Sequence, residues 1–247
     1  MLVLNVINLC VSLILEIWLA ILLFRRNVRR HFPLFAFYIF LSVPITAARL
    51  LSVGHYTVYF YVFWLTEAVL LALGLAALHE VFHCVYEGFY QILAFRLFYY
   101  GVIALVLIIT AINAIANPPG KADPLVGLIL RMGIAVNLLR AGIAAFYGAL
   151  IKPLDIGFRR YPTGIVMGFG LSALGPFLGY FALSVFGTKF EVFTKNISAV
   201  AYILGGLVWL LAFSGPERKE EWLPPMPPEE MLRIVRGYLR VLGRKEQ

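Results

Sequence analysis

Residues 57–87 read TVYFYVFWLTEAVLLALGLAALHEVFHCVYE, an apolar run interrupted by few polar side chains. A helix of about 20 apolar residues crosses a hydrocarbon layer of about 30 Å, so this run predicts a membrane-spanning helix at about 57–83. The run also carries the two features on which the functional hypotheses depend. These are a carboxylate inside the span, Glu67, and the pattern His79-Glu80-Val81-Phe82-His83 near its end.

The composition of the whole chain excludes an ordinary soluble domain. The 247 residues are 62% apolar and 14% charged, whereas a soluble domain is about half apolar and about a quarter charged. The net charge of +8 is also typical of proteins that bind nucleic acid. However, the basic residues gather at the ends of apolar segments and in the tail, which favours anionic lipid headgroups as the partner. We expect no nucleic-acid partner and no cofactor.

Six further apolar segments resemble the first in length, so we predict an all-α, polytopic membrane protein. The predicted fold is a seven-transmembrane-helix bundle in residues 1–215. Its spans lie at about 3–24, 34–54, 57–83, 94–116, 125–151, 163–187 and 190–214. In the sixth span, Gly164, Gly168, Ser172 and Gly175 recur at nearly every fourth position, which predicts close packing against a neighbouring helix.

The loop charges predict an orientation. Arginines follow the first span and flank the sixth, and more occupy the tail, whereas the alternate loops contain only isolated lysines. Because cytoplasmic loops are enriched in Lys and Arg, we expect the amino terminus outside and the carboxyl terminus in the cytoplasm.

The tail, residues 216–247, is predicted to be a Pro-rich linker followed by a basic amphipathic helix. At 100° per residue, one face of this helix carries Arg233, Arg236, Arg240 and Arg244. Such a helix suits the anionic headgroup layer, and docking on a cytoplasmic or membrane protein partner is the alternative.

Charged residues inside the spans are costly and often functional. Arg49, Glu67 and Arg131 lie toward the outer side, and Glu16 and Arg140 lie near mid-membrane; Asn137 and Lys195 complete the polar set. Depth along the membrane therefore suggests two acid–arginine pairs with one arginine left over. These pairs either support folding and insertion or line a polar pocket in the outer half that accepts an acidic or polar small molecule.

The pattern at His79 to His83 matches the letters of a zinc-protease helix, in which two histidines bind zinc and the glutamate activates water. On this hypothesis Glu80 is the catalytic residue, with Asp155 as the third metal ligand. Leu154-Asp155-Ile156-Gly157 loosely resembles the Leu-Asp-Gly segment of site-2-type membrane proteases. A regulatory metal or pH-sensitive pair is a second alternative. We favour a structural cluster at the helix end, with no metal and no catalytic residue.

The stretch Tyr61 to Ala68, followed by Glu80-Val81-Phe82, resembles seven-helix membrane proteins of bacterial genomes that have no assigned activity. The resemblance implies the same fold in a bacterial inner membrane. By analogy of fold with seven-helix receptors and sensor input modules, we predict a non-enzymatic sensor or ligand-binding module. The alternatives are a small-solute transporter, an intramembrane zinc metalloprotease, and a structural subunit of a membrane complex.

Overall fold

The chain is described by a computed structural model that covers residues 2–86, 96–97, 99–101, 103–105, 108, 112, 124–151, 159–186 and 191–215. The long elements in these ranges are α-helices, and a short 3-10 helix, η1 (Val28–Arg30), joins the first two. The long helices are α1 (Leu2–Arg25), α2 (Pro33–Ser52), α3 (Tyr56–Val85), α6 (Pro124–Ile151), α7 (Arg160–Phe186) and α8 (Glu191–Ser214).

Within the described residues, six helices are long and apolar enough to cross a membrane. They coincide with six of the predicted spans, which confirms an all-helical, multi-pass, membrane-embedded protein. The outward surface agrees with this, because large apolar side chains such as Ile14, Leu51 and Leu211 are exposed. Most of the predicted span at 94–116 and the whole tail, with its four arginines, lie outside the described residues.

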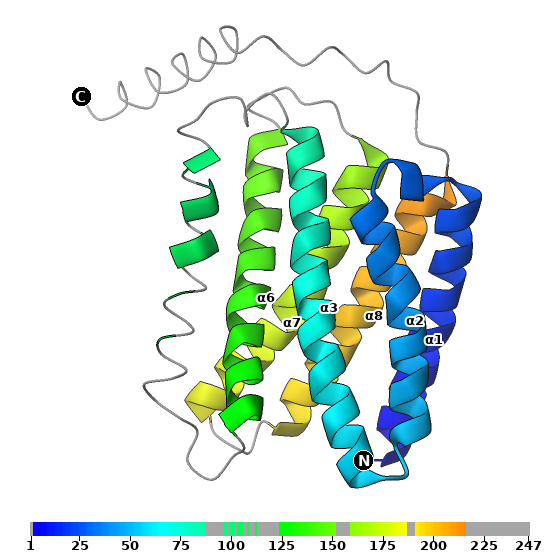
Figure 1. Cartoon of the computed structure of the whole chain (residues 1–247), viewed down its shortest axis with the longest axis vertical. Helices are drawn as coiled ribbons and strands as arrows, with labels where there is room; N and C mark the ends of the chain where they lie inside the picture. The colour runs from blue at the N-terminus through cyan, green and yellow to red at the C-terminus, as the bar shows by residue number, and fades with distance from the viewer. Residues whose placement is uncertain are drawn as a thin grey trace, which may run out of the picture.

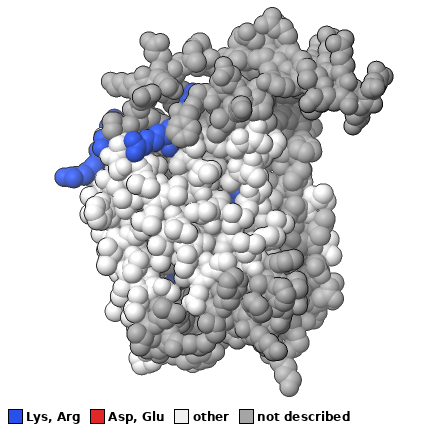
Figure 2. Space-filling view, turned by 180° about the vertical axis from the view of Figure 1, so that it is seen from behind, with Lys and Arg blue, Asp and Glu red and all other residues white. Residues whose placement is uncertain are grey.

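The six helices stand side by side as a bundle (Figure 1). Going around the bundle, α1 packs on α2, α2 on α3, α3 on α6, α6 on α7, α7 on α8, and α8 returns to α1. α3 also contacts α7, the other neighbour of α6 in this order. We call the end where α1 finishes and α2 starts the Arg-rich end. In a view from behind, arginine side chains gather at this end above a broad, mostly uncharged surface (Figure 2).

Aromatic rings fill the bundle toward the Arg-rich end. Phe35 of α2 lies 5.8 Å from Phe169 of α7 and 5.5 Å from Trp209 of α8, measured between ring centroids. Phe169 and Trp209 are 5.0 Å apart in an edge-to-face arrangement, the geometry that aromatic quadrupoles prefer. Tyr38 and Phe213 extend this cluster. These rings are buried, so this half of the interior is packed with apolar surface.

α7 and α8 meet through small residues, as the spacing of the sixth span predicts. A Cβ atom added at Gly168 would overlap the Trp209 indole, and one added at Gly164 would overlap the Ala212 side chain. On the facing helix, a Cβ at Gly205 would lie 2.6 Å from the Gly168 carbonyl oxygen. The two backbones therefore approach too closely for larger side chains, which is how small residues favour helix association in lipid.

The turn after α1 sets the geometry of the Arg-rich end. Asn27 has φ 53° and ψ 28°, in the left-handed region. Asparagine tolerates this conformation better than most residues and can end a helix there. Val28, which follows, is 1% exposed and anchors η1 to the core.

Candidate functional site

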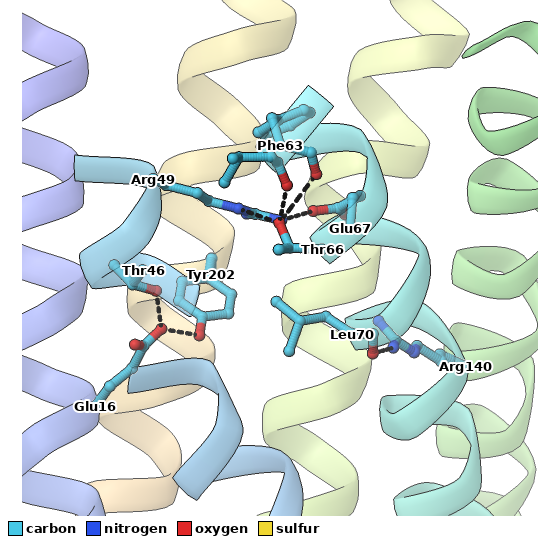
Figure 3. Close-up of polar contacts among 10 residues, drawn as sticks. Glu16, Thr46, Arg49, Phe63, Thr66, Glu67, Leu70, Arg140 and Tyr202 are labelled. Carbon is cyan, nitrogen blue, oxygen red and sulfur yellow. Dashed lines mark hydrogen bonds and ion pairs between the residues drawn. The ribbon is translucent and has the colours of Figure 1, made fainter. Parts of the chain in front are cut away.

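Polar side chains from α1, α2, α3, α6 and α8 meet inside the bundle at three places (Figure 3). The first centres on Glu16 of α1, which is 2% exposed. Its Oε1 accepts hydrogen bonds from the Thr46 hydroxyl of α2 at 3.1 Å and the Tyr202 hydroxyl of α8 at 2.5 Å. Its Oε2 is buried and has no hydrogen-bond partner among the described residues. A single carboxyl group thus joins three helices and keeps one acceptor unused.

The second place is an ion pair between α2 and α3. Arg49 Nη2 lies 3.0 Å from Glu67 Oε2. Arg49 Nε donates to the Thr66 hydroxyl at 2.9 Å, and its guanidinium lies over the Phe63 ring, 4.7 Å from the centroid. The Arg49 side chain is 11% exposed and that of Glu67 is 34% exposed. The arginine is therefore enclosed, while the carboxylate reaches the surface of the described bundle.

The third place holds a buried arginine without an ion pair among the described residues. Arg140 of α6 donates through Nη2 to the carbonyl oxygens of Leu70 and Leu71 on α3, both at 2.9 Å. Its Nη1 lies 3.5 Å from Asn137 Oδ1, and its Nε is buried with no partner in the described part of the chain. Gly74 permits this contact, because a Cβ there would overlap Nη2 and lie 2.7 Å from Cζ.

The predicted acid–arginine pairs are therefore half correct. Glu67 pairs with Arg49, but Glu16 does not pair with Arg140. The reason is position around the ring: α1 packs on α2 and α8, whereas α6 packs on α3 and α7. Equal depth in the membrane does not bring two side chains together when their helices are not neighbours.

Besides the four tail arginines, three predicted site residues lie outside the described side chains. Arg131 and Lys195 belong to α6 and α8, but their side chains lie outside what the structure describes, and Asp155 lies outside the described residues altogether. Conversely, sequence reasoning did not single out Thr46 and Thr66. A hydroxyl one turn from Arg49, or directly before Glu67, was the available signal, since such a group can solvate a buried charge.

Glu80 acts as a cap for a neighbouring helix. Its Oε1 accepts from the backbone N–H of Leu34 at 3.0 Å and its Oε2 from that of Phe35 at 3.1 Å. These are unpaired first-turn N–H groups of α2, whose own N-cap residue, Phe32, provides no side-chain acceptor. A carboxylate is favourable there because the helix dipole is positive at that end. Both Glu80 oxygens are thus engaged in joining α3 to α2.

The two histidines of the motif have different surroundings. The ring nitrogens of His79 lie 3.3 Å from the Tyr99 hydroxyl and 3.3 Å from the Tyr100 hydroxyl. His83 is exposed, and its ring centroid is 6.3 Å from that of His79. In the described ranges, no three His, Cys, Asp or Glu side chains lie close enough together to hold a metal ion.

Comparisons with protein-family models, curated proteins and solved structures give no match for the chain. The fold and its interior alone therefore define the class: an all-helical, multi-pass membrane protein with charged side chains enclosed between its helices.

Proposed function

We propose that the protein is a non-enzymatic sensor or ligand-binding module that takes up a small polar molecule between α1, α2, α3 and α8. In this proposal the bundle has seven spans in a bacterial inner membrane, with the amino terminus outside and the carboxyl terminus in the cytoplasm. The observation that carries the proposal is Glu16 Oε2, a buried carboxyl oxygen that lacks a partner among the described residues while its twin accepts two hydroxyl groups.

A buried acceptor without a hydrogen bond destabilises the folded protein. A buried polar group without a hydrogen bond costs about 1–3 kcal/mol, and more when it is charged. Polar groups inside membrane spans are often retained for function. A ligand hydroxyl or ammonium group would satisfy Glu16. Arg49 lies one helical turn from Thr46 on the same helix, so an acidic group of the same ligand would share its guanidinium with Glu67.

The position of the charges supports entry from the end opposite the Arg-rich end. Arg49 lies near the end of α2 and Glu67 in the first half of α3, so both are in that half of the bundle, and Glu67 is partly exposed. The aromatic cluster of Phe35, Phe169 and Trp209 packs the other half. This favours a sensor over a transporter, because transport requires a polar path through both halves. Binding at Glu16 would reach α1, α2 and α8 directly, since its contacts join those helices.

The test is ligand-induced thermal stabilisation of the purified protein in lipid nanodiscs. A panel of small amino acids, amino alcohols and hydroxy acids is screened, and each stabilising compound is repeated with Tyr202→Phe and Thr46→Val. Both changes remove a hydroxyl that positions Glu16, so we expect the shift to fall by half or more.

Two matched variants serve as controls. Tyr161→Phe removes a hydroxyl that donates to the Gly215 carbonyl, and Thr163→Val removes one that bonds to Tyr147, both near the Arg-rich end. We expect them to retain the full shift. A shift that survives both site variants, or one lost equally in the controls, would contradict a site at Glu16.

A further inference from the structure

Two arginines from distant parts of the chain meet at the last turn of α8. Arg26 Nη2 donates to the Ser214 carbonyl oxygen at 2.9 Å. Arg160 Nη2 donates to the Leu211 carbonyl at 2.6 Å and lies 3.3 Å from the Ser214 hydroxyl. A Cβ at Gly215 would overlap the Arg160 guanidinium, so this side chain lies directly against the backbone. Two arginines thus join the ends of α1, α7 and α8, and both contact Ser214.

Among the described residues, the positive charge at this place exceeds the negative charge. The carboxyl end of a helix carries about half a negative charge, which offsets part of two guanidinium charges. Arg25, Arg29 and Arg30 lie at the same end. Among the described acidic side chains, Glu80 is the one at this end, and both its oxygens accept α2 backbone N–H groups. The space-filling view shows the resulting concentration of basic side chains (Figure 2).

The two arginines also adjoin the ends of candidate membrane spans, where lipid headgroups would lie. Arg26 directly follows the apolar span that ends at Arg25, Arg160 begins the span of α7, and Ser214 ends the span of α8. A guanidinium has five N–H donors in a planar fork, which suits phosphate oxygens. The hydrogen bonds to α8 hold each guanidinium in place through its Nη2 atom. Both side chains are therefore ordered before a ligand binds, which lowers the entropy cost of binding.

We propose that Arg26 and Arg160 form a binding site for a phosphate group, supplied by an anionic lipid headgroup or by a soluble phosphate ester. The phosphate would accept charge-assisted hydrogen bonds from both guanidinium groups and relieve their mutual repulsion. Because Arg26 follows α1, Arg160 begins α7 and both donate hydrogen bonds to α8, the bound phosphate would stabilise the contacts among these three helix ends. This site is independent of the one proposed at Glu16.

The test compares thermal unfolding in nanodiscs of phosphatidylcholine alone with nanodiscs that also contain phosphatidylglycerol. We expect phosphatidylglycerol to raise the unfolding midpoint of the unaltered protein. Arg26→Gln and Arg160→Gln should each weaken phosphatidylglycerol binding by about fivefold, because each removes charge-assisted hydrogen bonds to the phosphate, and the double variant should abolish the stabilisation. The control is the double variant Arg29→Gln and Arg30→Gln, which removes the same charge from exposed positions of η1 and should retain most of the effect.

Further measurements distinguish the source of the phosphate and protect the test from misfolding. Glycerol phosphate added to phosphatidylcholine nanodiscs supports a soluble ligand if it raises the midpoint, and a lipid ligand if only phosphatidylglycerol does so. Native mass spectrometry of the single variants counts bound phosphatidylglycerol should the double variant fail to fold. The site is excluded if neither phosphate source stabilises the unaltered protein, or if the control loses as much binding as the Arg26 and Arg160 variants.

Discussion

Replacing Gly74 with alanine tests how the buried Arg140 is held. The new methyl group would lie 2.7 Å from Cζ and overlap Nη2, so the guanidinium must move away. A methyl carbon packs at about 3.5 Å or more from another carbon. The required displacement of about 1 Å takes the two 2.9 Å hydrogen bonds to the Leu70 and Leu71 carbonyls beyond bonding distance. No retreat is available without losing these acceptors, because both belong to the same turn of α3.

The magnitude follows from the bonds lost and the propensity gained. Two hydrogen bonds to a charged group contribute about 1.5 kcal/mol each at the lower end of their range, or about 3 kcal/mol together. Alanine in place of glycine in a helix returns about 1 kcal/mol. We therefore expect Gly74→Ala to lower the free energy of unfolding by about 2 kcal/mol.

A double-mutant cycle in mixed detergent micelles measures this coupling. In an Arg140→Ala background the guanidinium is absent, so Gly74→Ala should change stability little, with the alanine gain offset by its 3.2 Å approach to Phe169. The control is Gly142→Ala on α6, where a Cβ meets nothing within 4 Å and alanine should stabilise by about 1 kcal/mol. The reasoning is refuted if Gly74→Ala stabilises like the control, or if it destabilises equally with and without Arg140.

Three further changes test other contacts. Glu80→Gln should lower the free energy of unfolding by about 1–2 kcal/mol, because a neutral amide has one acceptor oxygen for the two α2 N–H groups that the carboxylate binds. Unchanged hydrogen exchange of the backbone amides at the start of α2 would contradict this. Gly168→Val should separate α7 from α8 and destabilise by about 2 kcal/mol or more, since its side chain overlaps Trp209, whose fluorescence reports the change. Asn27→Ala should lower the free energy of unfolding by about 1 kcal/mol, whereas Asn27→Gly should leave it nearly unchanged, because the backbone there is left-handed. Thermal unfolding measures both, and equal effects of the two substitutions would argue against that conformation.

The sequence predicted the helices well because the signal for a membrane span is local. An apolar run of sufficient length must satisfy its backbone hydrogen bonds internally, so it becomes a helix whatever its neighbours are. The predicted spans at 34–54 and 57–83 therefore match α2 (Pro33–Ser52) and α3 (Tyr56–Val85) to within about two residues. The small-residue spacing of α7 was equally readable, because one helix face determines how closely another backbone can approach.

The depth of each charge in the membrane could also be predicted from its position in the span, since a helix rises about 1.5 Å per residue. Depth was sufficient to predict the ion pair of Arg49 and Glu67, because α2 and α3 follow each other in the chain and pack together. It was insufficient for Glu16 and Arg140. Their partners depend on which helices are neighbours around the ring, and no local pattern in the sequence specifies that order.

The motif in the third apolar segment shows the same division. The sequence by itself determined that His79, Glu80 and His83 lie near one end of a long membrane-spanning helix, because composition and helical geometry fix position along the span. Only the tertiary structure decided what Glu80 does. Its carboxylate lies against the start of α2 and accepts two backbone N–H groups there, and this contact exists because α2 and α3 pack side by side with that end of α2 uncapped by its own side chains.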